Sequence, residues 1–409
     1  MDGANKELGE KLVIRKPPAS RPIPSFPAAF FSAAGSEPSV YQPVLRRAIW
    51  TVSTYRDRIE SRCREITLEP AVDPIDLDSL YAALARYDLP APLDIEPRAE
   101  QGVNNLNLRI RTGAEILRCK VFSDAHPEEA LRYEQLLLQA LAQSDLSFAL
   151  PVPLADRHGE ILQPTPLGWL ALIPDLPGSN LDPSDLGQVE SLGAALGELH
   201  VALARLPTTP RPGRALFQEF FRFPPALRDP LLLTPAQIGA PDTAATRDLF
   251  AWWHQEATRL AAFVDGPYCQ LPLQLCHNDP APYNVLARSG QVSGFIDFEF
   301  ACPAPRGLDI VMALRMTMRI WEQPAPWASA EAFCRGYQRV ARLSEAEVAQ
   351  LPELFRLRGA MGTLWALGRN VPIDPARMVE HLGYLCNAAA WLDQQGSRLA
   401  DLVAHHLGA

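Results

Sequence analysis

The chain has 409 residues, 47% of them hydrophobic, and a formal net charge of −9, so it is long enough to bury sizeable cores in two or three domains. The negative charge, with arginines scattered rather than massed, excludes the clustered basic face of a nucleic-acid-binding protein. The sequence shows no signal peptide and no apolar run of about 18 residues. We therefore expect a cytoplasmic protein without a membrane partner.

The seven cysteines predict neither a disulfide framework nor a zinc site. Their number is odd, and no two of them have the C-x-x-C spacing that is typical of zinc ligands. Several lie in apolar runs, where a free thiol behaves as a small buried hydrophobic group. The cysteines are Cys63, Cys119, Cys269, Cys276, Cys302, Cys334 and Cys386.

The first 70 residues are predicted to form an N-terminal extension. Residues 1–40 are rich in Pro, Ser and Ala without hydrophobic periodicity, which is typical of a disordered or loosely attached segment. Residues 41–66 have apolar side chains near helical spacing and predict one helix.

A strand-rich region is predicted next. It starts with an amphipathic helix over 77–87, and strands are expected at 106–111, 116–122, 149–154 and 169–173. Before the first strand, Gly102 and the small polar residues after it form a loop whose backbone N–H groups suit phosphate oxygens. A single glycine is a weak signal, and a plain β-turn explains the same residues.

Lys120 is the most informative residue of this region. After Lys16 it is the only lysine in a chain that otherwise uses arginine for positive charge. An ammonium is a compact point charge that fits between phosphates, whereas a guanidinium is a broader fork. We therefore expect Lys120 to have a chemical role. The alternative is that this lysine remained in the sequence by chance and has no such role. The helix predicted over 127–142 follows, with Glu134 at its middle.

The rest of the chain is predicted to be mainly helical. Residues 205–245 are rich in Pro and Arg and predict an irregular insertion. His200, on a core helix, is interpreted as a structural residue. Helices are expected at 186–204, 246–264, 310–318, 330–341, 352–367 and 378–392.

Residues 275–299 carry four polar side chains on two short apolar strands, which no hydrophobic core requires. These are His277, Asp279, Asn284 and Asp297. A hairpin would hold Asn284 and Asp297 together, and their amide and carboxylate oxygens suit a hard cation such as Mg²⁺. Asp279 would then stand beside the metal. The alternative is an ordinary hairpin with polar tips.

The order H-x-D-x-x-x-x-N, with the aspartate of I-D-F thirteen residues after the asparagine, resembles the catalytic and metal-binding segments of protein-kinase-like phosphotransferases. More narrowly, it resembles the aminoglycoside phosphotransferase and choline kinase superfamily, including type II homoserine kinases. The resemblance begins near Asp76 and departs from many relatives at Asn278, where they have glycine. It implies a two-lobed α+β fold with a small antiparallel-sheet N-lobe over 71–178 and a larger, mainly helical C-lobe over 179–409.

The resemblance also implies roles for the motif residues. Asp279 would accept or orient the proton of the attacking hydroxyl, with His277 bracing its loop. Asn284 and Asp297 would hold Mg²⁺, and Lys120, paired with Glu134, would position the phosphates of ATP.

Further positions follow from the same resemblance. Gly102 and Asn107 would belong to the loop that covers the nucleotide, and the backbone of Asp175 and Leu176 would bind adenine. The alternative for Asp175 and Leu176 is a linker that binds no ligand.

The C-lobe carries less specific expectations. Asp309 would cap its helix and brace the catalytic loop. Glu299 would reach metal or substrate, the alternative being a surface charge. Tyr337, Arg358 and Trp365 would line the substrate pocket.

The sequence thus predicts an enzyme that transfers the γ-phosphoryl group of ATP to a hydroxyl of a small molecule such as an amino alcohol, a homoserine-like compound, an aminoglycoside or a sugar. The alternative is a catalytically weak nucleotide-binding pseudo-enzyme with a regulatory or scaffolding role. No base or metal ligand of the motif is missing, which favours the enzyme.

Overall fold

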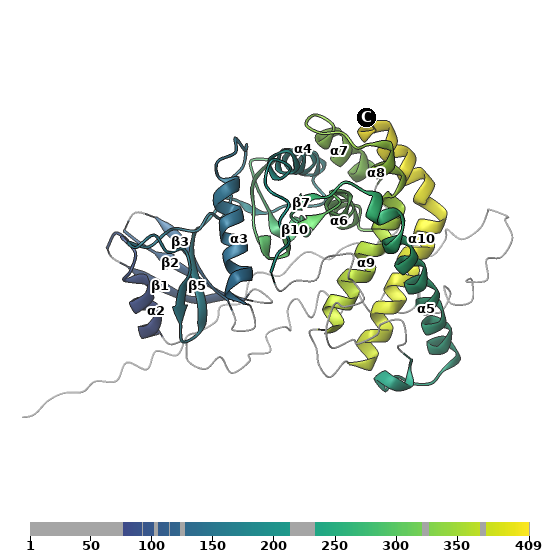
Figure 1. The fold of residues 1–409 in the computed structure, drawn as a ribbon, viewed down its shortest axis with the longest axis horizontal. Coiled ribbons are helices and arrows are strands. Elements are labelled where there is room, and N and C mark those ends of the chain that lie inside the picture. Colours follow the sequence, from purple (N-terminus) through teal and green to yellow (C-terminus); the bar gives the residue numbers. More distant parts are fainter. Residues whose placement is uncertain are drawn as a thin grey trace, which may run out of the picture. The chain divides into compact units, whose positions relative to one another are not determined.

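The computed structural model describes residues 77–91, 93–101, 105–113, 115–122, 127–212, 234–320, 327–368 and 374–408. The predicted extension over 1–70, its helix over 41–66, and Gly102 lie outside the described residues. The α+β class is confirmed, because an antiparallel sheet is followed by a mainly helical region (Figure 1).

The N-terminal region is built on one five-stranded sheet with the strand order β1-β2-β3-β5-β4. Every neighbouring pair runs antiparallel. Three of its strands, β2, β3 and β5, confirm predicted strands. The bounds are β1 (Asp94–Gln101), β2 (Asn105–Arg111), β3 (Ile116–Phe122), β4 (Gln163–Thr165) and β5 (Gly168–Pro174).

The strand predicted over 149–154 is wrong. Ala149 makes only an isolated bridge, and no ladder continues from it. Pro151 and Pro153 explain this, because proline has no N–H group to donate to a sheet. The two strands that the sequence did not reveal, β1 and β4, lie at the sheet edges, and each contains a proline, which edge strands tolerate.

The two faces of the sheet have different partners. One face packs against α2 (Leu77–Leu84) in an apolar cluster that includes Cys119 and Val121. Because side chains alternate along a strand, Lys120 lies on the other face. Phe122 shares that face and packs against Leu131 of α3 (Glu128–Leu141). Figure 1 shows α2 and α3 on opposite sides of the sheet.

The C-terminal region confirms the predicted helices, with boundaries that shift by a few residues and a much longer last helix. Its helices are α4 (Leu186–Leu203), α5 (Ala244–Asp265), α6 (Gly307–Met318), α7 (Trp327–Tyr337), α8 (Glu345–Ala349), α9 (Leu351–Gly368) and α10 (Pro375–Leu407). The short helix α8 was not predicted. None of the helices in the described part of the chain is long and apolar enough to cross a bilayer.

Short strands and turns lie among these helices. One sheet has the order β6-β8-β9 and another pairs β10 with β7. The strands are β6 (Ser179–Asn180), β7 (Gln274–Cys276), β8 (Val285–Arg288), β9 (Gln291–Phe295) and β10 (Cys302–Ala304), and the 3₁₀ turns are η2 (Ala236–Ile238), η3 (Pro267–Gln270), η4 (Pro282–Asn284) and η5 (Phe298–Phe300).

Helices α4 and α7 approach each other closely through glycine. A Cβ atom on Gly193 would lie 2.0 Å from the carbonyl oxygen of Phe333, and one on Gly336 would lie 1.8 Å from that of Glu190. Only glycine allows this backbone contact. It brings the ends of both helices together, where His200 and Tyr337 form a buried hydrogen bond of 2.9 Å.

Candidate active site

The motif of residues 275–299 folds around the hairpin of β8 and β9. Strand β7 ends one residue before His277, and the η4 turn ends at Asn284, immediately before β8. The N–H of Ile296, just after β9, donates to the carbonyl oxygen of Asn284 at 2.9 Å. Asn284 and Asp297 therefore lie at the same end of the hairpin.

Asp279 is held by three neighbouring side chains. Asn284 Nδ2 donates to its Oδ2 at 2.9 Å, Arg358 Nη2 donates to its Oδ1 at 3.0 Å, and the Tyr283 hydroxyl is 3.3 Å from Oδ1. Burial raises the pKa of the Asp279 carboxyl, and the positive charge of Arg358 opposes this without cancelling it. The carboxylate is thus oriented by hydrogen bonds and largely removed from solvent.

His277 supports the loop from inside. Its Nδ1 accepts a hydrogen bond from the N–H of Asp279 at 3.2 Å, so the ring proton belongs on Nε2, which lies 3.1 Å from the carbonyl oxygen of Ile296. The ring is fully buried against Phe298. His277 therefore links the segment before Asp279 to the segment before Asp297.

Asn278 has a backbone conformation that also suits glycine, the residue that the resemblance led us to expect at this position. Its φ is +64°, in the left-handed region that favours glycine and that asparagine tolerates better than most residues. The asparagine side chain adds contacts, since Nδ2 lies 3.2 Å from the carbonyl oxygen of Phe300 and 3.1 Å from that of Cys302. The departure from glycine is thus compatible with the same loop.

Asp309 pins this loop to α6. Its carboxylate accepts the N–H groups of His277 at 2.9 Å and Asn278 at 2.6 Å, and His200 Nε2 lies 3.1 Å away. The expectation that Asp309 caps α6 is wrong: it is the third residue of the helix, and its oxygens face the loop instead. The interpretation of His200 as a structural residue agrees with this buried position.

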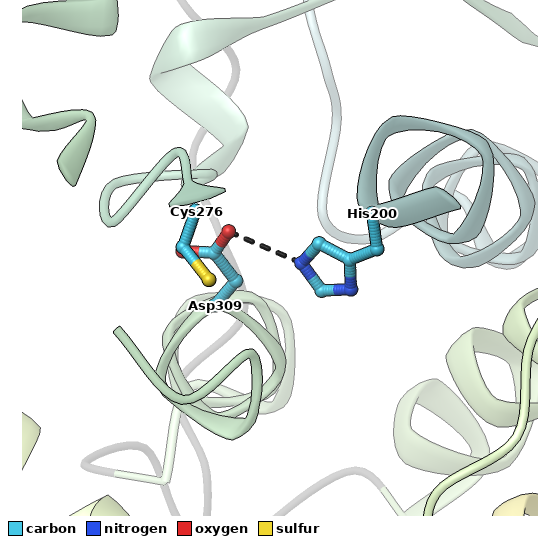
Figure 2. A group of neighbouring side chains, drawn as sticks. All are labelled: His200, Cys276 and Asp309. Atoms are coloured by element: carbon cyan, nitrogen blue, oxygen red, sulfur yellow. Dashed lines mark hydrogen bonds and ion pairs between the residues drawn. The ribbon is translucent and has the colours of Figure 1, made fainter. Parts of the chain in front are cut away.

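Figure 2 shows the same neighbourhood, in which His200, Cys276 and Asp309 place three potential ligand atoms within 4.8 Å of one another. Hydrogen bonding explains the group without a metal. Burial raises the pKa of the Cys276 thiol well above its usual value, and the thiol donates to the carbonyl oxygen of Ala304 at 3.3 Å. Asp309 already accepts backbone N–H groups. We interpret the group as a structural brace.

Lys120 lies between two carboxylates. Its Nζ is 3.4 Å from Glu134 Oε1 and 3.3 Å from Asp297 Oδ1. Burial lowers the pKa of Lys120, but the two carboxylates more than compensate, so the pKa is raised overall and the side chain is charged. The sheet of the N-terminal region and the loop after β9 are thereby joined at the candidate site.

Arg211 completes this arrangement and was missed by the sequence analysis. Its Nη2 donates to Glu134 Oε2 at 3.2 Å, and its Nη1 donates to the carbonyl oxygen of Phe298 at 3.1 Å. Both Arg211 and Glu134 are almost fully buried. The contacts run from Asp297 through Lys120, Glu134 and Arg211 to Phe298. They form a closed ring, because Phe298 directly follows Asp297 in the chain. Arg211 lies in the Pro- and Arg-rich stretch, which offers no periodic pattern to mark it.

The loop residues of the N-terminal sheet are only partly described. Asn107 on β2 lies directly opposite Lys120 on β3 in the strand register. Asn105 Nδ2 donates to Glu299 Oε2 at 3.3 Å. Glu299 is only 4% exposed, so the alternative that it is a surface charge is wrong.

The segment after β5 contains the predicted adenine-binding residues. The carboxylate of Asp175 pairs with Arg118 at 2.6 Å and Arg109 at 3.2 Å, and its N–H donates to the carbonyl oxygen of Ile116 at 3.3 Å. Because this N–H is already used, Leu176 is the better candidate for backbone contact with a base. Leu176 lies beside β9, close to Gly294.

The three residues predicted to line a substrate pocket differ in position. Tyr337 is fully buried and bonded to His200, so its assignment to a pocket is wrong. Arg358 contacts Asp279, and Trp365 packs edge-on against Phe300 at 5.4 Å between ring centres. Tyr283, which the sequence analysis did not single out, lies four residues after Asp279 and is 46% exposed.

The sheet, the helical region and this constellation define a protein-kinase-like phosphotransferase. The microcompartment-associated aminopropanol kinase has the same fold, with a TM-score of 0.56 and 17% identity over 80% of this chain and 99% of that one. An aminoglycoside phosphotransferase from Alicyclobacillus acidocaldarius subsp. acidocaldarius DSM 446 gives a TM-score of 0.55 and 19% identity over 80% and 96%.

Sequence comparison defines the family. The model of the phosphotransferase enzyme family matches residues 95–351. The homoserine kinase of Phenylobacterium zucineum (strain HLK1) is 32% identical over 282 residues, which cover 68% of this chain and 80% of the relative. The homoserine kinase of Gluconobacter oxydans (strain 621H) is 30% identical over 280 residues, which cover 68% of this chain and 83% of the relative. The chain belongs to the phosphotransferase enzyme family, and it is a small-molecule kinase.

Proposed function

We propose that the protein transfers the γ-phosphoryl group of ATP, with Mg²⁺, to a hydroxyl group of a small molecule. The observation that carries the proposal is the convergence of Lys120, Asp279, Asn284 and Asp297 at the end of one hairpin. Lys120 is joined to Asp297 at 3.3 Å, and Asn284 to Asp279 at 2.9 Å. Phosphoryl transfer requires positioning and charge neutralisation rather than covalent catalysis, and this set supplies a carboxylate base, a phosphate-binding cation and oxygen ligands.

Asp279 is the proposed base. Arg358 and Asn284 fix its carboxylate, and its raised pKa increases the affinity for a proton from the attacking hydroxyl. His277 holds the peptide that precedes it. Lys120 is the proposed phosphate ligand, and Glu134 with Arg211 keeps its ammonium in place.

Asn284 and Asp297 fit a hard cation by their chemistry. Asn284 Nδ2 donates to the carbonyl oxygen of Asp279 at 3.0 Å and to its carboxylate, which leaves the amide oxygen as the ligand atom. Asp297 supplies an anionic oxygen from a side chain that is 39% exposed. A bound Mg²⁺ would neutralise phosphate charge at this point. An amicoumacin kinase with a similar fold was solved in complex with AMP-PNP and Ca²⁺. Its TM-score is 0.56, with 16% identity over 77% of this chain and 93% of that one. Its bound nucleotide and divalent cation support the proposal of the same two ligands here.

The adenine of ATP is proposed to lie at Leu176, where the chain passes from the proposed N-lobe (71–178) to the proposed C-lobe (179–409). Asn107 is proposed to face the phosphates beside Lys120, because the two residues are cross-strand neighbours. Gly102 retains its proposed place in the covering loop.

The test is acceptor-dependent ATP consumption, with homoserine, choline, aminoglycosides and sugars as candidate acceptors.

Asp297→Asn should weaken Mg²⁺-dependent nucleotide binding by about 10-fold or more, the scale on which even outer-shell partners contribute to metal affinity. A Mg²⁺ titration of nucleotide binding measures this, with the exposed Asp145→Asn variant as the control. An unchanged titration would refute the metal role. If no acceptor stimulates ATP consumption while ATP still binds, the pseudo-enzyme is the better description.

Arg211→Ala should lower the free energy of unfolding by about 3 kcal/mol, because it removes one partner from a buried ion pair. It should also raise the KM for ATP by about 10-fold, since Glu134 then loses the contact that keeps it beside Lys120. Urea unfolding and steady-state kinetics measure the two effects, and the exposed Arg205→Ala is the matched control. An Arg211→Ala enzyme with wild-type stability and wild-type KM would contradict the ring of contacts.

A further inference from the structure

Tyr283 contacts the candidate base from the solvent side. Its hydroxyl lies 3.3 Å from Oδ1 and 3.4 Å from Oδ2 of Asp279, almost equally far from the two oxygens. The other two side-chain donors to this carboxylate are Asn284, which is 6% exposed, and Arg358, whose side chain is 11% exposed. Tyr283 is 46% exposed. Of the three donors, only Tyr283 therefore reaches the carboxylate from solvent.

The hydrogen bond from Tyr283 is also the weakest of the three. Asn284 Nδ2 donates at 2.9 Å and Arg358 Nη2 at 3.0 Å, which are ordinary N–H···O lengths. An O–H···O bond is usually about 2.5–3.0 Å long, so the tyrosine contact at 3.3 Å is loose. A carboxylate has about four lone-pair sites, and the two short bonds leave acceptor capacity on the side that Tyr283 covers. Another hydroxyl can therefore replace that of Tyr283.

The backbone of Tyr283 is held in place although its ring is exposed. Tyr283 lies in the η4 turn, which is closed by the N–H of Asn284 donating to the carbonyl oxygen of Ala281 at 2.8 Å. Asn180 Nδ2 donates to the carbonyl oxygen of Tyr283 at 3.3 Å. The hydroxyl can therefore leave Asp279 by rotation of the side chain alone, and exposed side chains change rotamer within nanoseconds.

A carboxylate base beside ATP can activate water as well as an acceptor hydroxyl, since both offer an O–H group. In the reaction with water, the water oxygen bonds to the γ-phosphorus of ATP. The bond from that phosphorus to the β–γ bridging oxygen breaks, its electron pair leaves with ADP, and the water proton passes to Asp279 and then to solvent. The products are ADP and inorganic phosphate. A kinase suppresses this side reaction by excluding water from its base.

We propose that Tyr283 covers the proton-accepting side of Asp279 until an acceptor displaces it, so that phosphoryl transfer is selective for the acceptor over water. This rests on the proposed phosphotransfer at Asp279. The tyrosine hydroxyl holds the place of the attacking hydroxyl. An acceptor with further contacts to the site can displace a loose hydrogen bond, whereas a single water molecule gains no such contacts. Tyr283 is thus a positioning residue that acts through Asp279.

ATP hydrolysis without any acceptor measures this role and does not require the substrate to be known. Tyr283→Ala should raise the hydrolysis rate by about 10-fold or more, because full access to a general base contributes about 100-fold or more. The conservative variant Tyr283→Phe keeps the ring over the carboxylate and should largely suppress this increase. The double variant Tyr283→Ala with Asp279→Asn should lose the increase altogether, since the base is gone. Tyr81→Ala removes another exposed tyrosine and is the matched control.

A second measurement follows the acceptor. Homoserine, choline, kanamycin and glucose are tested, and the phosphorylated product is counted against the ADP formed at acceptor concentrations below KM. The wild-type enzyme should form nearly one product per ADP, and Tyr283→Ala should form clearly less, because water then competes for the base. Should Tyr283→Ala not fold, Tyr283→Ser, which also removes the ring, decides by the same two measurements.

The outcomes separate the two proposals. If an acceptor is phosphorylated but Tyr283→Ala hydrolyses ATP no faster than the wild type, the covering role is wrong and the proposed function stands. The covering role is also wrong if Tyr283→Phe hydrolyses ATP as fast as Tyr283→Ala, or if the increase survives Asp279→Asn. If no acceptor is phosphorylated but the increase appears and depends on Asp279, the covering role stands and transfer to a small molecule fails. Neither activity would refute both.

Discussion

Asp279→Asn should lower kcat by about 100-fold or more and leave ATP affinity nearly unchanged, the scale expected for loss of a general base. The substitution keeps the size of the side chain but removes the oxygen that can take a proton. It also removes the negative charge that balances Arg358, which lies 3.0 Å away. Steady-state kinetics with the preferred acceptor and separate nucleotide-binding measurements test both parts.

Two variants make this result interpretable. Asp145→Asn changes the same chemical group at an exposed position and should keep wild-type kinetics. Tyr283→Phe removes the hydroxyl that lies 3.3 Å from the Asp279 carboxylate and should cost far less than Asp279→Asn, since it leaves the base in place. Near-normal turnover of Asp279→Asn would exclude Asp279 as the base.

Lys120→Arg should reduce kcat/KM nearly as much as Lys120→Ala, by about 100-fold, which is the scale on which a single preorganised donor contributes. The ammonium lies 3.4 Å from Glu134 Oε1 and 3.3 Å from Asp297 Oδ1, and the Lys120 side chain is only 11% exposed. A guanidinium is longer and directs its donors as a fork, and the second oxygen of Glu134 already belongs to Arg211.

Lys120→Arg is the more informative of the two variants, because it conserves the positive charge. If charge alone mattered, Lys120→Arg would keep most of the activity, and Lys120→Ala would not. Arg205→Lys, an exposed exchange between the same two residue types, controls for the substitution itself. Full activity of Lys120→Arg would show that the site does not require a compact ammonium.

The parts of the fold that the sequence predicted have strong local patterns. The helices of the C-terminal region carry long apolar stripes, and strands β2 and β3 flank a clear turn. The strand predicted over 149–154 failed because its apolar residues suggested a ladder that two prolines cannot form. Strands β1 and β4 were missed because edge strands need less apolar character than central ones.

The candidate site likewise has residues that local sequence patterns reveal and residues that they do not. The proximity of Asp279, Asn284 and Asp297 could be predicted because all three lie in or next to one short hairpin. Lys120 stood out because lysine is so rare in this chain. The position of Arg211 could not be predicted, because its partner Glu134 is distant in sequence and the two residues meet only in the folded chain. Helical periodicity placed Tyr337 and Arg358 on helices but did not reveal that one faces His200 and the other Asp279.

The loop that carries Asp279 is fastened to the segment after Asp297 at two places. Strand β10 pairs with β7 just before the loop, and Asp309 accepts the N–H groups of His277 and Asn278. Neither segment can open without breaking the bonds of the other, so they form one cooperative unit in local unfolding. The distance between Asp279, the proposed base, and Asp297, the proposed metal ligand, is thereby protected by the free energy of the whole unit rather than by either loop alone.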